Sequence, residues 1–103
     1  MTELVVRRLL IDLEKPFERH WCDGDPFRTA LFNALSMSFP VGEQFFIDAV
    51  RNAAKTLPPE QQAQFDAEVR GFVGQEATHR RIHGLFNAHL EKQGLVNHWA
   101  PRI

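Results

Sequence analysis

The feature that most constrains the fold is an unbroken helical spacing in the C-terminal half of the chain. Eight residues follow one another at offsets of 4, 3, 4, 3, 4, 3 and 4: Phe65, Val69, Phe72, Glu76, His79, His83, Phe86 and Leu90. This spacing, called the seam below, keeps all eight side chains on one face of an α-helix, the face expected to be buried. Pro59 suits the first turn of such a helix and Gly94 suits its end, so the pattern predicts a helix over residues 59–92.

An earlier segment predicts a second helix, over residues 27–55. Its apolar residues share one helical face, at offsets of 3, 4, 7, 4 and 3, and they are Phe32, Leu35, Phe39, Phe46, Val50 and Ala53. Asp25 suits the N-cap, with Pro26 at the first helical position. Pro40 interrupts the pattern, so we expect either one bent helix or two short helices that meet near Pro40.

The flanking segments show no such periodicity. Residues 1–26 combine a short apolar and basic stretch with Pro, Gly and Asp, which predicts an extended arm or short strand and then a loop. Residues 95–103 are expected to form an irregular tail. A chain of 103 residues is long enough for one domain and too short for two. We therefore expect a single helical domain over residues 1–103, divided into an arm and loop (1–26), a helical hairpin (27–94) and the tail.

Composition excludes several classes of function. The chain has 12 basic and 13 acidic residues, so a net charge of −1 predicts no nucleic-acid or anionic-membrane partner. Its one cysteine, Cys22, cannot form an intrachain disulfide. The start of the chain lacks the basic-then-apolar order of a signal peptide, and no apolar run is long enough to span a bilayer. The expectation is a soluble cytoplasmic protein.

The seam has three ionisable side chains at its centre, where apolar ones are expected. A carboxylate buried alone costs several kcal/mol, and a metal cation is one efficient partner for carboxylates and neutral imidazoles. Glu76 and His79 form a Glu-x-x-His element whose spacing directs both side chains to one ion. Glu43 falls in the gap between Phe39 and Phe46 on the other predicted helix. A lone Glu on one helix and Glu-x-x-His on the next is half the ligand set of a di-iron or di-manganese carboxylate bundle.

Metal-free interpretations of these residues remain open at this point. Glu76 has Arg80 at i+4, and Glu43 has Arg51 or Arg81 as a partner in the fold. A lone buried histidine is usually a structural one.

His83 lies one helical turn beyond His79. Its position suits the role of a metal ligand, of a hydrogen-bond donor that holds a carboxylate, or of a proton shuttle. We expect the donor or acid–base role, and Asn87 is placed to orient the ring. Three histidines lie off the seam and are expected at the surface or in the tail: His20, His89 and His98.

Two segments together resemble the bacterial proteins described as predicted metal-dependent hydrolases. They are SMSFPVGEQFF at residues 36–46 and GQEATHRRIH at residues 74–83, and the resemblance extends from about residue 6 to residue 94. It implies a ferritin-like fold, in which Glu43, Glu76 and His79 match the metal-ligand positions of the first half of the bundle. Such proteins also carry a second helix pair with another Glu and another Glu-x-x-His, and this chain ends before that pair. We expect either a truncated product or two copies that pair about a two-fold axis.

These observations predict an all-α fold, a ferritin-like long helical hairpin that forms a four-helix bundle by dimerisation. The predicted function is a metal-dependent hydrolase with a di-metal carboxylate site completed across the homodimer. The predicted metal ligands are Glu43, Glu76 and His79, and the predicted catalytic residue is His83. The metal would be iron, manganese or zinc, and the substrate a small molecule. The alternatives are an oxygen-activating di-iron oxidase or oxygenase, a metal-binding bundle without turnover, and a metal-free helical interaction module.

Overall fold

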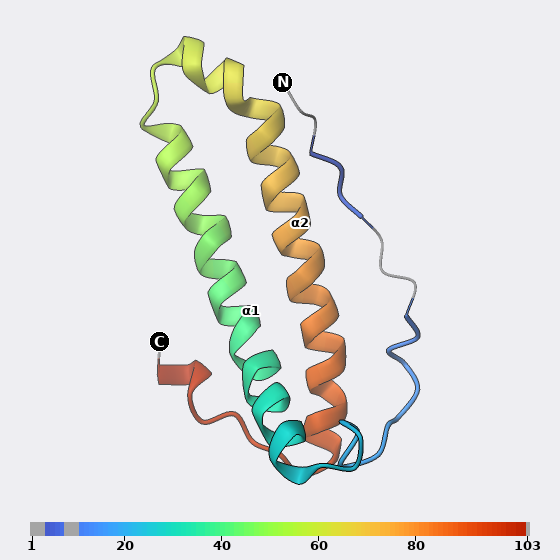
Figure 1. Ribbon diagram of the computed structural model, residues 1–103. Helices are drawn as coiled ribbons and strands as arrows, with labels where there is room; N and C mark the ends of the chain where they lie inside the picture. Colours follow the sequence, from blue (N-terminus) through green and yellow to red (C-terminus); the bar gives the residue numbers. More distant parts are fainter. Residues whose placement is uncertain (1–3, 8–10, 103) are drawn as a thin grey trace.

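Two long helices lie side by side and form a hairpin. The structure, a computed structural model, describes residues 4–7 and 11–102. Helix α1 spans Pro26–Lys55, helix α2 spans Pro59–Lys92, and a short 3-10 helix, η1, spans Ala100–Arg102 (Figure 1). The described residues form no strand, which confirms the all-helical hairpin. Of the two arrangements expected at the start of residues 1–26, an extended arm or a short strand, the described residues adopt the arm, because no neighbouring strand is present with which they could pair.

The predicted start of α1 is confirmed. The Asp25 carboxylate accepts hydrogen bonds from the backbone N–H groups of Phe27, at 2.9 Å, and Arg28, at 3.0 Å. These are two of the donors that a helix leaves without an intrahelical acceptor at its first turn. Pro40 lies inside α1, which runs as one helix through it. Of the two arrangements expected at Pro40, the single helix is therefore the one adopted.

The end of α2 also follows the sequence signal. Gly94 adopts a φ of +90°, a conformation that glycine reaches without a steric penalty. The turn lets the Leu95 N–H donate to the Leu90 carbonyl at 3.1 Å and so satisfies one of the last carbonyls of the helix.

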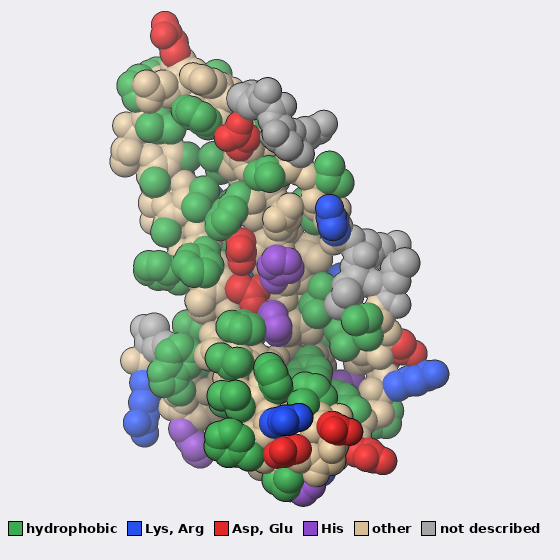
Figure 2. Space-filling view, viewed as in Figure 1, with side chains coloured by type: hydrophobic (Ala, Val, Ile, Leu, Met, Phe, Trp, Pro, Cys, Tyr) green, Lys and Arg blue, Asp and Glu red, His purple; other side chains and the backbone are tan. Residues whose placement is uncertain are grey.

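The face of α1 that packs on α2 is not the apolar face predicted for it. Its buried side chains are mostly polar: Thr29, Asn33, Ser36, Glu43 and Ile47. Four of the six residues of the predicted apolar face stay between 41% and 50% exposed, and they are Phe32, Leu35, Phe39 and Phe46. We call these four residues the open apolar face. Figure 2 shows hydrophobic side chains gathered around acidic and histidine side chains on one face of the hairpin.

The seam is likewise only partly covered. Leu90 is its one fully buried residue, and together with Ile47 it makes up the buried hydrophobic core within the described residues. The expectation of a buried seam was therefore wrong for a single chain. The physical reason is that each helix of a two-helix hairpin has only one helical neighbour, which can cover only part of its circumference.

The N-terminal arm runs along α2 (Figure 1). A Cβ at Gly71 would lie 2.5 Å from the Leu4 Cβ, and a Cβ at Gly74 would lie 2.7 Å from a methyl carbon of Val6. The Gln75 side-chain amide donates to the Val5 carbonyl at 3.1 Å. The two glycines thus form a shallow groove on α2 that admits the arm at close range.

A second part of the arm docks near the end of α2 and corrects one prediction. His89, expected at the surface, is 7% exposed, and its ring bonds to the Leu13 carbonyl. The Phe17 ring stacks on Phe86 with centroids 4.8 Å apart, and the Gln93 amide donates to the Phe17 carbonyl at 3.0 Å. His89 is buried because this part of the arm packs on α2 beside the seam and contacts both His89 and the seam residue Phe86.

Candidate metal centre

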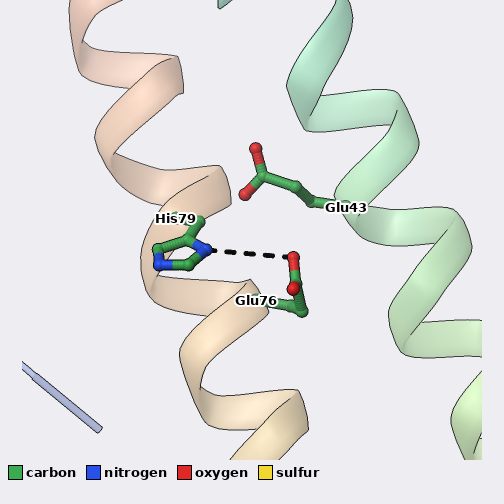
Figure 3. A group of neighbouring side chains, drawn as sticks. All are labelled: Glu43, Glu76 and His79. Atoms are coloured by element: carbon green, nitrogen blue, oxygen red, sulfur yellow. Dashed lines mark ion pairs between the residues drawn. The ribbon is translucent and has the colours of Figure 1, made fainter.

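The hairpin brings Glu43, Glu76 and His79 together at the middle of the two helices. One ligand atom of each residue lies within 4.8 Å of the others, and no other such group of His, Cys, Asp or Glu occurs in residues 4–7 and 11–102. Figure 3 shows Glu43 extending from α1 toward Glu76 and His79, which lie one turn apart on α2. The i, i+3 spacing places the latter two on one face of α2, and the antiparallel packing sets Glu43 opposite them.

Glu43 is the most deeply placed of the three ligand candidates. Its side chain is 9% exposed, and both carboxylate oxygens are buried with no hydrogen-bond partner. Burial raises the pKa of this carboxyl above 4.5, and the nearby Glu76 carboxylate raises that pKa further. His79 and Arg80 lower the pKa by a smaller amount. A bound cation would compensate the cost of burying a carboxylate that has no hydrogen-bond donor.

Glu76 and His79 form the solvent-facing side of the cluster. The His79 Nδ1 lies 4.0 Å from a Glu76 oxygen, with side-chain exposures of 57% for His79 and 17% for Glu76. His79 is therefore much less buried than the seam pattern predicts. The centre is closed by α1 on one side and remains open on the side of the imidazole.

His83 adjoins the cluster one turn further along α2. Its Nε2 lies 3.8 Å from a Glu43 oxygen, and its Nδ1 lies 3.2 Å from the Ser36 hydroxyl. The imidazole and the Phe39 ring pack in a T-shaped arrangement, with centroids 4.7 Å apart. Burial lowers the pKa of His83 below 6.5, and His79 lowers it further, so the neutral ring is favoured at neutral pH.

Ser36 is a site residue that the sequence analysis missed. Its hydroxyl donates to the Asn87 side-chain carbonyl at 2.7 Å, in addition to its contact with His83. A sequence signal for it exists: Ser36 lies seven residues before Glu43, a helical repeat that places both on the same face of α1. Asn87, expected to orient His83 directly, instead acts through this hydroxyl.

The metal-free ion pairs considered for the two carboxylates do not form. The ion pairs of the described residues join Glu43 and Glu76 only to histidines, and neither Arg80 nor Arg51 nor Arg81 pairs with them. The two carboxylates therefore share an apolar-framed site in which no arginine forms a direct ion pair with either of them, although Arg80 acts on Glu43 from a greater distance. Two carboxylates and an imidazole are donors that suit iron, manganese or zinc.

An open apolar pocket lies beside His83. Its volume is about 370 Å³, and its lining comes from the arm, the loop and both helices: Leu13, Trp21, Phe32, Leu35, Ser36, Phe39, Ile82, His83 and Phe86. Since Phe32, Leu35 and Phe39 belong to the open apolar face, the pocket and the carboxylate cluster lie next to each other on one side of the hairpin.

Comparison with known proteins identifies one similarity. Residues 5–102 match the sequence model of a family described as predicted metal-dependent hydrolase. No curated protein and no solved structure matches the chain. Neither helix of the described residues combines the length and apolar character needed to cross a membrane.

Proposed function

The chain belongs to the family of predicted metal-dependent hydrolases, and we propose that it provides half of a di-metal carboxylate centre. Glu43, Glu76 and His79 are the metal ligands in this proposal, and His83 is a catalytic residue beside them. The observation that carries the proposal is the Glu43 carboxylate, whose two buried oxygens have no donor and lie beside two further ligand atoms.

A second copy of the chain would complete the site. A di-metal carboxylate bundle uses a Glu from each of two helices and Glu-x-x-His from each of two others. Two hairpins related by a two-fold axis supply that set, each with Glu43, Glu76 and His79. The open apolar face surrounds the half site, so pairing through this face would bury exposed apolar surface and bring the two half sites together. The result is a ferritin-like four-helix bundle.

The proposed reaction is hydrolysis of a small-molecule substrate. A bound divalent metal would supply Lewis-acid activation of the bond to be cleaved and of the attacking water. Glu43, Glu76 and His79 would hold the metal, while the Nε2 atom of His83, 3.8 Å from a Glu43 oxygen, would exchange a proton with the attacking water or the leaving group. The apolar pocket next to His83 suits an apolar portion of the substrate.

Metal content and molar mass, measured on the same sample, test this proposal. Purified protein reconstituted with iron, manganese or zinc should hold about one metal per chain and scatter light as a dimer of roughly 24 kDa, twice the 11.9 kDa chain. Glu76→Ala should remove most of the metal. Glu91→Ala, the same change at an exposed carboxylate of the same helix, should leave the metal content unchanged.

The same sample separates the competing functions. Protein that binds metal and hydrolyses model esters or phosphates supports the proposal. Protein that binds metal and consumes oxygen identifies an oxidase. Metal without either turnover identifies a binding protein. A dimer that takes up no metal would be an interaction module, and it would refute the proposed centre.

A further inference from the structure

The side chains of Ser36, His83 and Asn87 form a hydrogen-bond relay between the two helices, and its direction can be read from their chemistry. The Asn87 Nδ2 donates to the Ser36 backbone carbonyl at 3.0 Å. A carbonyl can only accept, so this bond fixes which end of the Asn87 amide is NH2 and which is oxygen. The Asn87 Oδ1 then lies 2.7 Å from the Ser36 Oγ and must accept from the hydroxyl, since an amide oxygen has no proton to give.

The relay determines where neutral His83 carries its proton. The Ser36 hydroxyl has a single hydrogen, and that hydrogen points to Asn87. The His83 Nδ1, 3.2 Å from the Ser36 Oγ, can therefore bond to this oxygen only as a donor. Neutral His83 is then the Nδ1–H tautomer, and its Nε2 bears a lone pair. This Nε2 is the atom that faces Glu43, at 3.8 Å from its carboxylate.

We propose that Ser36 and Asn87 are positioning residues that hold His83 in the Nδ1–H tautomer and present its Nε2 lone pair to the carboxylate centre. There the lone pair can accept a proton from a water or substrate held beside Glu43, Glu76 and His79. The opposite tautomer would direct an N–H to the centre and could accept nothing. The role at the centre rests on the proposed function, whereas the tautomer is a property of the metal-free chain.

The packing around the relay makes this arrangement specific. Ser36 is 7% exposed, so water does not replace its partners freely. The Phe39 ring packs against the imidazole at an interplanar angle of 66°, so a rotation of the imidazole would disturb this contact. Ser36 and Asn87 come from α1 and α2 respectively, so the tautomer is set only when the hairpin has formed.

The nitrogen-15 NMR spectrum of the histidine side chains tests the tautomer directly. In metal-free protein at pH 8, long-range proton–nitrogen correlations should show His83 with a protonated Nδ1 and a bare Nε2. Asn87→Leu should reverse this pattern, because the Ser36 hydroxyl loses its acceptor and becomes free to donate to Nδ1. Ser36→Ala should leave a mixture of both tautomers.

Ser38→Ala is the matched control. Ser38 lies two residues further along α1, and its hydroxyl donates to the Leu35 carbonyl of its own helix. This variant should keep the wild-type His83 pattern. Circular dichroism checks that each variant is helical, and Ser36→Ala decides the question if Asn87→Leu does not fold. A bare Nδ1 in the wild-type protein, or an unchanged pattern in Ser36→Ala, would overturn the proposal.

Zinc addition to the same labelled protein tests the second part. The His83 Nε2 resonance should move on zinc loading, while that of exposed His98 should not. A stationary His83 resonance despite measured zinc binding would show that Nε2 does not face the centre. If no zinc binds at all, the proposed function fails while the tautomer result stands.

Discussion

A single buried carboxylate dominates the chemistry of the site at the scale of residues. Glu43 lies between apolar positions on α1, and neither of its oxygens meets a donor. The charged form is therefore disfavoured in the metal-free chain, which is why the pKa of Glu43 is raised. A cation would remove the penalty, so the residue that destabilises the metal-free hairpin is the one that favours metal binding.

Glu43→Gln should stabilise the metal-free protein at pH values above about 4.5, where Glu43 ionises in the unfolded chain. The Glu43 carboxyl keeps its proton to a higher pH in the folded chain than in the unfolded chain, where its pKa is near 4.5. Stability of the wild-type protein therefore falls, relative to the variant, as pH rises from about 4.5 through the folded-state value. The difference should level off at about 1–3 kcal/mol, the usual cost of a buried polar group without a partner. Urea unfolding in a chelator across this range measures it, with Glu91→Gln as the matched control for the same substitution at an exposed position of α2.

Metal should reverse that order of stability. A ligand that binds only the folded state stabilises it by about 2.7 kcal/mol at a hundredfold excess over its dissociation constant. Zinc or manganese should therefore raise the melting temperature of the wild-type protein and leave that of Glu43→Gln nearly unchanged. Differential scanning calorimetry with and without metal measures both. An equal rise in the two proteins would mean that Glu43 is not a ligand.

At the scale of elements, each helix has two faces with different partners. α1 sets its polar stripe against α2 and leaves the open apolar face toward solvent. α2 carries the seam on one side and receives the arm on another, where Gly71 and Gly74 admit it at close range. The arm therefore takes part in the packing of α2, although it has no regular structure of its own among the described residues.

Gly71→Ala should loosen the arm even though alanine is the better helix former. The new Cβ would lie 2.5 Å from the Leu4 Cβ, so the arm must shift. Gly84→Ala, on the same helix with nothing within 4 Å of the new Cβ, is the matched control and should gain about 1 kcal/mol from helix propensity. Limited proteolysis of the arm should accelerate in the first variant alone. Equal gains in stability would contradict close packing of the arm at Gly71.

The whole molecule is a thin hairpin with few fully buried apolar side chains. Its dimensions are 53 × 32 × 19 Å, and the smallest of them leaves room for only one layer of helices. Domains normally bury the apolar side of each layer against another layer. The open apolar face and the half set of ligands thus point to the same missing layer, which our proposal assigns to a second copy.

Phe46→Lys should convert the proposed dimer into a monomer. Phe46 is half exposed on the open apolar face, and a lysine there would place a charge in the interface. Phe45→Lys is the control, because neighbouring residues point about 100° apart around a helix and Phe45 lies off this face. Light scattering should give about 12 kDa for the first variant and about 24 kDa for the second. Wild-type protein that is a folded monomer would rule out completion of the site by a second copy.

Much of the hairpin could be predicted from local patterns. The seam spacing, the Asp25 cap and Gly94 depend on neighbours within one or two turns, so they define the two helices without reference to tertiary structure. The grouping of Glu43 with Glu76 and His79 could also be predicted, because all three interrupt apolar stripes at helical spacing.

Other features depended on how the helices rotate against each other. Sequence periodicity marks an apolar stripe but does not say which stripe meets a neighbour in the same chain, so it could not predict that Phe32 and Phe39 stay half exposed within one hairpin. The exposure of His79, the burial of His89 beneath the arm and the contact of Ser36 with His83 likewise arise between segments far apart in sequence. By itself, the sequence determined two amphipathic helices and the residue types of the site. Only the tertiary structure decided which faces are covered, because burial depends on the partner that a face meets as well as on its own composition.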